Sequence, residues 1–341
     1  LSTKDSEFGE NSDVKIKLEA LLKAGFIVVI NTGETWERVK QRIVQYINKD
    51  LRKNLIIYLG DGSRKIKFTG DQENGDESGD YINEYQTAIE KEKVDYISGT
   101  LFKKVLKSWE TKCADAQKSD KGFIGKHQER FVKDGKLVSP DIDTEKEGRS
   151  RFGDVTKIAI HNISSPQAAN KGTVIKTDIR NSIVEEIKEE FRSLCWDLQV
   201  NIGGKATIVI LKRGISKAVP IKDLVQRERV SLKHSIFVGD EFREGANPAG
   251  DLSVLSIEGI NIIAVNKDQP SVTPGVLKGG AGVEATKQLM ECLLQAHQDF
   301  KGKNNTVHVE AIPAMAIEAV MKKLKKNIND GGMSEKYSPR V

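Results

Sequence analysis

The chain has 341 residues, of which 30% are charged and 38% hydrophobic; this composition is ordinary for a soluble folded protein, and the length favours two domains. The formal net charge of +5 is small and comes from scattered lysines, which argues against nucleic-acid binding. The three cysteines show no C-x-x-C spacing, and no apolar run has the length of a membrane span. We therefore expect a cytoplasmic protein that binds neither nucleic acid nor a membrane.

The first part of the chain alternates helices and strands. Residues 1–13 are polar and predict a tail, and apolar residues at helical spacing predict helices over 14–24 and 35–48. Continuous apolar runs predict buried strands over 26–30 and 55–59, with a hairpin return over 65–68. This order of elements is typical of right-handed parallel α/β units.

The composition changes in the middle of the chain. Residues 69–80 are acidic and rich in glycine, which indicates a domain edge. Beyond it we expect helices over 81–112 and 181–194, a short strand pair at 123–124 and 136–138, and alternating strands over 157–161, 198–202 and 207–211. Residues 81–212 therefore read as an inserted α+β domain.

The chain then returns to the first domain. We predict helices over 217–230, 283–298 and 314–327, buried strands over 235–238 and 261–265, an edge strand over 307–312, and a tail over 331–341. The expected fold is α/β, with a Rossmann-like doubly wound parallel sheet built from residues 14–80 and 213–330.

Polar residues follow the ends of these core strands. Thr32 and Gly33 follow 26–30, Lys217 stands at a helix start, and Asp240 and Glu241 follow 235–238. Because open parallel sheets bind ligands at the carboxyl ends of their strands, we expect these residues to meet. A hydroxyl, an ammonium and helix amides can hold a phosphate, and carboxylates suit Mg²⁺. Each feature alone is more often a turn, a cap or a solvated side chain.

This ordered set resembles the haloacid dehalogenase superfamily, in particular its phosphatases with a large inserted α/β (C2-type) cap. The resemblance rests on FIVVINTGETWERV, TIVILKRGISKA, IFVGDEFREGAN and GGAGVEATKQLMECL, and covers about residues 14–68 and 205–300. It implies that Thr32, Gly33 and Lys217 bind the transferred phosphoryl group, and that Thr32 and Lys217 also serve the catalytic step. It implies further that Asp240 binds Mg²⁺.

Further site residues follow from the resemblance. Glu241 and Asn247 support the metal, and Asp251 can replace the second acid, because this chain reads Ala246-Asn247-Pro248 where members often carry Gly-Asn-Asp. Lys205 and Arg213 are candidates for substrate contact from the cap.

One feature of the family has no counterpart. Its nucleophile is the first Asp of an Asp-x-Asp after an apolar strand that precedes the Thr32 motif, but the first thirteen residues contain no apolar run. Asp5 lacks the strand, and Asp13 fits a helix N-cap. We expect either an N-terminally incomplete form of a longer protein, or another segment such as 307–312 filling the gap between strands 26–30 and 235–238.

The resemblance implies Mg²⁺-dependent hydrolysis of a phosphomonoester through an aspartyl-phosphate, with a sugar phosphate or a similar small phosphorylated metabolite as substrate. Two alternatives stay open: a catalytically inactive binding or scaffold protein of the same fold, and a phosphosugar mutase. A nucleotide-binding doubly wound domain is disfavoured, because neither G-x-G-x-x-G nor a P-loop follows the first strand.

Overall fold

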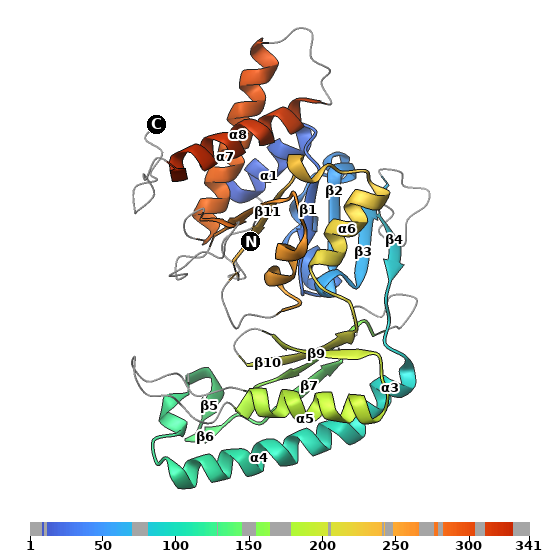
Figure 1. Ribbon diagram of the computed structural model, residues 1–341, viewed down its shortest axis with the longest axis vertical. Coiled ribbons are helices and arrows are strands. Elements are labelled where there is room, and N and C mark those ends of the chain that lie inside the picture. Colours follow the sequence, from blue (N-terminus) through green and yellow to red (C-terminus); the bar gives the residue numbers. More distant parts are fainter. Residues whose placement is uncertain are drawn as a thin grey trace. The chain divides into compact units, whose positions relative to one another are not determined.

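The computed structural model describes residues 9, 12–69, 81–127, 129–144, 155–163, 179–203, 206–240, 242, 248–265, 276–278, 282–303 and 311–329. The chain divides into unit 1, which comprises residues 1–85 and 216–341, and unit 2, which comprises residues 86–215 (Figure 1). The sequence places these boundaries at 80/81 and 212/213. Among the described residues, no helix has the length and apolar character needed to cross a membrane.

The first half of unit 1 is built around β2 (Leu55–Leu59). β2 pairs in parallel with β1 (Val28–Asn31) and antiparallel with β3 (Arg64–Phe68), and β4 (Tyr81–Gln86) is the outer strand of this sheet. The other elements are α1 (Asp13–Lys23), α2 (Trp36–Arg42) and the short helical turns η1 (Val44–Tyr46), η2 (Lys49–Asn54) and η3 (Gly60–Gly62). The predicted helix over 35–48 is therefore shorter than expected.

The prediction of a helix over 81–112 is wrong at its start, where the chain forms β4. Tyr81 packs against Trp36 of α2 and Phe68 of β3, with ring centroids 4.7 and 6.3 Å away. These partners are distant in sequence, so local periodicity does not reveal them. The helical part comprises α3 (Lys91–Tyr96), the π-helical turn η4 (Ile97–Leu101) and α4 (Phe102–Ser119).

The second half of unit 1 holds a separate parallel sheet. Its strands are β11 (Ile236–Gly239), β12 (Asn261–Ala264) and β13 (Val276–Lys278), in that order. The helical elements are α6 (Ala218–Arg227), η7 (Leu232–His234), η8 (Asp251–Ser256), α7 (Gly282–Lys303) and α8 (Ile312–Asn329). The predicted edge strand over 307–312 lies mostly outside the described residues, and Ile312 begins α8.

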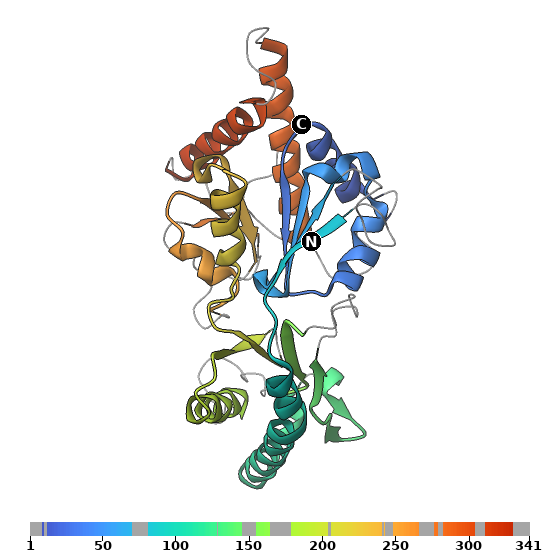
Figure 2. The ribbon, with the colours of Figure 1, turned by 90° about the vertical axis from the view of Figure 1, so that its right-hand side faces the viewer.

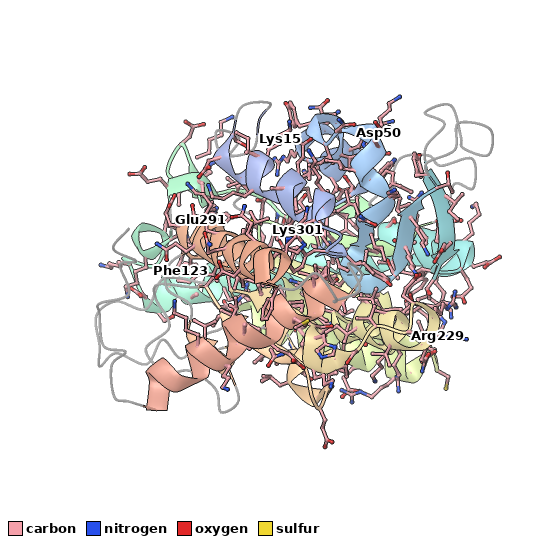
Figure 3. The ribbon with its side chains drawn as sticks, turned by 90° about the horizontal axis from the view of Figure 1, so that it is seen from above. Lys15, Asp50, Phe123, Arg229, Glu291 and Lys301 are labelled. Carbon is pink, nitrogen blue, oxygen red and sulfur yellow. The ribbon has the colours of Figure 1, made fainter. Side chains whose placement is uncertain are left out.

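Helices cover both faces of the strands in unit 1, which gives the α/β, doubly wound arrangement. Ile57 of β2 packs in one core with α1 and α2, whereas Ile56 and Tyr58 face Leu224 of α6. On the second sheet, Ile262 of β12 packs with Ile221 of α6. Its other face packs against α7 and α8, which lie beside each other in Figure 3. α6 therefore contacts both sheets.

β1 and β11 are the two facing edges of these sheets (Figure 2). Among the described residues, β1 pairs with β2 alone and β11 with β12 alone. Both edge strands are half-buried, whereas every residue of β2 is buried. Val28 and Ile236 nevertheless belong to one apolar cluster with Leu293 of α7. The gap predicted between strands 26–30 and 235–238 is confirmed for the described part of the chain.

Unit 2 is an antiparallel sheet with two helices on one face. Its strand order is β7 (Asp141–Thr144), β8 (Lys157–His161), β10 (Thr207–Lys212) and β9 (Leu198–Gly203). α4 and α5 (Ile179–Ser193) pack on the face that carries Ile160 and Ile208. The predicted strand at 123–124 is wrong, because the chain turns there into η5 (Ile124–Lys126), and β6 (Lys136–Leu137) pairs with β5 (Val132–Lys133) instead. A short turn, η6 (Glu129–Phe131), precedes β5.

Candidate functional site

Lys217 is the N-cap residue of α6 and is fixed from three sides. Its side chain donates from Nζ to Asp251 Oδ1 at 2.8 Å, and its backbone N–H donates to Ala249 O at 2.9 Å. Its carbonyl accepts a hydrogen bond from Asn31 Nδ2 at 2.9 Å. The end of β1, the start of α6 and the start of η8 therefore meet at one lysine.

Asp251 connects Lys217 to the end of β11. Its side chain is 2% exposed, and its second oxygen, Oδ2, accepts the backbone N–H of Asp240 at 2.9 Å. A Cβ on Gly239 would lie 2.5 Å from this oxygen, so only glycine leaves room for the carboxylate. Asp240, the next residue, is exposed.

Thr32 lies one residue beyond Asn31, at the end of β1. Its hydroxyl oxygen accepts the backbone N–H of Glu34 at 3.1 Å, which leaves the hydroxyl hydrogen available to donate to a ligand. Its backbone is bound to the neighbouring strand end, with N–H to Tyr58 O at 3.0 Å and carbonyl to Asp61 N–H at 3.1 Å.

Asp61 follows β2 and lies beside the end of β1. The residue is largely buried, at 8% exposure, and its backbone has a φ of 57°, in the left-handed region that Asp tolerates better than most residues. A Cβ on Gly33 would lie 3.2 Å from Asp61 Oδ1. At the next position, a Cβ on Gly62 would lie 2.9 Å from the carbonyl oxygen of Ser216. The ends of β1 and β2 therefore adjoin the start of α6.

The site contains more negative than positive charge. Burial lowers the pKa of Lys217, but the charge and hydrogen bond of Asp251, together with the charges of Asp61 and Asp240, outweigh burial and raise the pKa above 10.5. Lys217 therefore stays protonated at neutral pH. One ammonium faces three carboxylates, which leaves a formal charge of −2 before any ligand binds.

Most of the predicted site residues of unit 1 lie close together in the structure. Lys217 and Asp251 are in direct contact, Asp240 is bound through its amide, and Thr32 and Gly33 lie beside Asn31 and Asp61. Glu241, Asn247 and Lys205 lie outside the described residues. Arg213, in unit 2, is exposed and pairs with Asp197 at 3.2 Å, the ordinary role of a surface arginine.

Two residues of this site were not predicted. Asp61 stands in the sequence Gly60-Asp61-Gly62, which is typical of a turn, and Asn31 is the residue just before Thr32. Their positions, directly after apolar strands of a parallel sheet, are the signal that could have identified them. Asn31 Oδ1 is also buried without a hydrogen-bond partner among the described residues, which is unusual for a buried polar atom.

The residues present fit a magnesium ion. Mg²⁺ in proteins takes one or two carboxylates and completes its octahedral shell with waters and substrate phosphate oxygens. Asp240 offers an exposed carboxylate, Asp251 lies next to it, and the site has an excess of negative charge. The described residues contain no group of three or more metal-binding side chains, so waters and substrate would supply the remaining ligands.

Solved structures with a similar arrangement share little sequence with this chain. The N-terminally truncated IMP-nucleotidase of Plasmodium falciparum is 11% identical, with a TM-score of 0.42, over 85% of this chain and 66% of that one. A haloacid dehalogenase-like hydrolase from B. subtilis is 13% identical, with a TM-score of 0.45, over 83% and 95%. The chain thus spans less than two thirds of the IMP-nucleotidase it matches. No curated protein matches the sequence.

A model of one protein family matches most of the chain. The family is described as haloacid dehalogenase-like hydrolase, and the match runs over residues 11–244. That range contains Thr32, Lys217 and Asp240. On this match, the chain belongs to the haloacid dehalogenase-like hydrolases.

Proposed function

We propose that the protein is a Mg²⁺-dependent phosphomonoester hydrolase of the cytoplasm, acting on a sugar phosphate or a similar small phosphorylated metabolite. The observation that carries this proposal is the placement of Lys217. It links the start of α6 to Asp251 directly and to the end of β1 through Asn31. These contacts join the start of α6, which carries the ammonium, to the end of β1, where Thr32 directly follows Asn31.

The phosphoryl group is bound by Thr32, Gly33 and Lys217. Thr32 donates its hydroxyl hydrogen, Gly33 offers a backbone position without a side chain, and Lys217 donates from Nζ to an equatorial oxygen. Charge-assisted hydrogen bonds of this kind are stronger than neutral ones. They also stabilise negative charge that develops as the phosphoryl group is transferred.

Asp240 and Asp251 would hold the magnesium ion, with Glu241 and Asn247 as further predicted ligands. When bound, the ion neutralises phosphate charge and orients the transferred group. The excess charge of −2 supports this requirement, because without a cation the carboxylates would repel a phosphate.

Attack on phosphorus requires a carboxylate in line with the leaving group. In the family this is an Asp-x-Asp after a strand, and the described part of unit 1 contains no Asp-x-Asp at a strand end. The residues assigned above therefore bind and polarise the substrate, and the attacking Asp is expected after a strand that pairs between β1 and β11. Its carboxylate forms the aspartyl-phosphate as the bond from phosphorus to the substrate oxygen breaks and the alcohol leaves. Water then attacks the aspartyl-phosphate, which releases orthophosphate and restores the carboxylate.

Unit 2 is proposed to act as the cap that selects the substrate, because the residues assigned in unit 1 bind only phosphate and metal. Lys205 and Arg213 remain its candidate substrate contacts. A phosphosugar mutase would use the same binding residues but return the phosphoryl group to the sugar instead of to water, so phosphate release separates these two functions.

The test is phosphate release from p-nitrophenyl phosphate and a panel of sugar phosphates. It is run with Mg²⁺ and with EDTA, on this chain and on a longer form that carries an Asp-x-Asp strand. We expect Mg²⁺-dependent release from the form that carries the Asp-x-Asp strand, and we expect Lys217→Met in that form to abolish it. Release that survives both EDTA and this substitution would refute the assignment.

A catalytically silent binding protein is the second candidate. It is favoured because the described part of unit 1 contains no Asp-x-Asp at a strand end. Orthophosphate or sugar-phosphate binding with no release from any form of the chain would establish it.

A further inference from the structure

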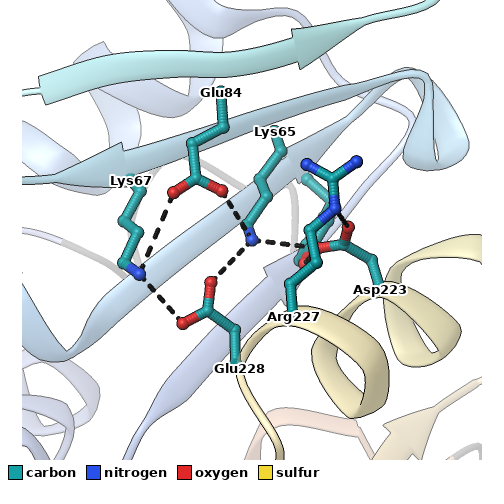
Figure 4. A network of polar contacts seen from close by, with 7 residues as sticks. Lys65, Lys67, Glu84, Asp223, Arg227 and Glu228 are labelled. Carbon is teal, nitrogen blue, oxygen red and sulfur yellow. Dashed lines mark hydrogen bonds and ion pairs between the residues drawn. The ribbon is translucent and has the colours of Figure 1, made fainter.

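Lys65 of β3 is completely buried and lies among carboxylates. Its Nζ is 2.7 Å from Glu84 Oε2, 2.9 Å from Asp223 Oδ2 and 2.8 Å from Glu228 Oε1 (Figure 4). A buried ammonium is stable only when its hydrogen bonds are made, and here each of its three hydrogens has an acceptor. This cluster lies outside the candidate site and contains none of its residues.

The cluster is balanced in charge. Lys67 contacts Glu228 at 2.9 Å, and Arg227 contacts Asp223 at 3.0 Å, so three cations face three carboxylates. Asp223 also accepts the hydroxyl hydrogen of Tyr58, which is completely buried in β2, at 2.7 Å. These contacts make a polar network in which the buried groups are paired, and such networks fix one arrangement of the elements they join.

The network joins α6 to the sheet at one end, and Lys217 stands at the other end. Asp223 lies in the middle of α6 and Glu228 is its C-cap residue, whereas Lys217 is its N-cap residue. Asp223 stands six positions after Lys217, which is about 9 Å along a rigid helix at about 1.5 Å per residue. A slide or rotation of α6 would therefore move Lys217 with respect to Asp251 and Asn31.

The same ammonium also holds the two segments through which the chain leaves and re-enters unit 1. Glu84 lies in β4, just before the boundary at 85/86, and α6 is the first helix after the boundary at 215/216. Lys65 thus binds β4, through which the chain leaves unit 1, and α6, the first helix after the chain returns to unit 1.

We propose that Lys65 is a positioning residue, which fixes α6 against the sheet and thereby holds Lys217 in the candidate site. This role concerns the lysine of the proposed function, but the experiment below does not depend on phosphate binding or turnover.

The test compares Lys65→Met with Lys65→Arg and with Lys17→Met as matched control. Lys17 also contacts two carboxylates, Asp13 and Glu291, but it joins α1 to α7 and does not touch α6. Two rates are measured by mass spectrometry: acylation of the Lys217 amine, and hydrogen exchange at the backbone amides of Lys217 and Ala218.

In Lys65→Met we expect both rates to rise by about tenfold, which corresponds to about 1.4 kcal/mol of local destabilisation. Lys65→Arg keeps the charge and should stay within about twofold of the wild type, as should Lys17→Met. A folded Lys65→Met with wild-type rates at Lys217 would overturn the proposal.

Should Lys65→Met fail to fold, Asp223→Asn provides the second variant. It keeps an oxygen acceptor for Tyr58 and removes one of the two charges through which α6 binds Lys65, the other being Glu228. We expect a rise of a few fold in both rates, and unchanged rates would overturn the proposal. If the rates rise but no variant or wild-type protein binds phosphate, the proposed function fails while the positioning role stands.

Discussion

Two lysines of unit 1 each face three carboxylates, yet they differ in how the contacts are made. Lys65 has no exposed side-chain surface and contacts Glu84, Asp223 and Glu228 directly. The side chain of Lys217 is 22% exposed and contacts Asp251, while Asp61 and Asp240 act on it through their charges.

This difference separates a structural ion cluster from a binding site. An ammonium with three acceptors has no donor left for a ligand, whereas Lys217 pairs with one carboxylate oxygen and keeps surface open to solvent. The pKa values of both lysines are raised above the ordinary value. Burial lowers the pKa of Lys65, but hydrogen bonds to Glu228, Glu84 and Asp223 raise it far above 10.5. Charge alone does not distinguish the two lysines, but the number of hydrogen-bond acceptors that each ammonium has among the described residues does: three for Lys65 and one for Lys217.

The largest expected effect is on folding stability. Lys65→Met leaves three carboxylates without their cation and should cost about 3–5 kcal/mol in the free energy of unfolding. Lys217→Met should cost about 1–3 kcal/mol, because Asp251 retains the amide of Asp240. Urea denaturation of both variants measures this. Equal losses of unfolding free energy in the two variants would contradict the difference in burial and pairing between Lys65 and Lys217.

Gly239→Ala should weaken the Lys217 cluster without removing any charge. The added methyl would lie 2.5 Å from Asp251 Oδ2 and 2.8 Å from its Cγ, so the buried carboxylate must shift. We expect a loss of about 1–3 kcal/mol, in the range of overpacked sites. Gly302→Ala in α7 is the control, because its new methyl meets no atom within 4 Å. A Gly239→Ala protein as stable as this control would contradict the close contact.

The contribution of the Lys65 cluster to the free energy of unfolding should depend on pH in the acid range. Hydrogen bonds from Lys65 and Lys67 lower the pKa of Glu228 below 4.5, against the opposing effect of burial. A carboxyl whose pKa is depressed by folding contributes stability above its unfolded value and loses it as the pH falls through the folded value. The difference in unfolding free energy between wild type and Glu228→Gln should therefore be constant above pH 4.5 and shrink below it. A difference that does not change with pH would show that this charge contributes nothing.

The smallest effect is expected at Asp61. Asp61→Asn removes one negative charge near Lys217, and Asn tolerates the left-handed backbone at this position. Two unit charges 4 Å apart in water interact by about 1 kcal/mol, so orthophosphate affinity without Mg²⁺ should rise by at most about fivefold. Calorimetric titration measures it, and a lower affinity in the variant would show that Asp61 supports the anion instead of repelling it.

Sequence patterns predict those elements of the fold whose apolar residues follow a single clear period. Continuous or alternating apolar runs place β2 and β8 at their observed residues, and helical spacing gives α1, α5 and α7. β4 was missed because its place depends on Trp36 and Phe68, which lie far away in sequence. Such long-range packing is not encoded in a local window.

The site is predictable only in part. Residue type and order predict that Lys217, at a helix start, and Asp240, directly after β11, lie at one place, and both residues contact Asp251. Asp61, in the turn sequence Gly60-Asp61-Gly62, was not predicted, whereas Asp251 was predicted as a replacement for the second acid, because the loop before it departs from the family pattern. The burial of Lys65 could not be foreseen, because lysines are almost never fully buried unless they are paired, and its partners come from β4 and α6.

The most direct test of the account is calorimetric titration of orthophosphate into wild type and Lys217→Met, each with and without Mg²⁺. The account predicts that Mg²⁺ strengthens binding to the wild type, because it neutralises the carboxylates around Lys217. It also predicts that Lys217→Met binds at least about tenfold more weakly, through loss of a charge-assisted contact. Equal binding by both proteins, or binding that Mg²⁺ does not affect, would contradict the central claim that Lys217 and its carboxylates form a phosphate and metal site.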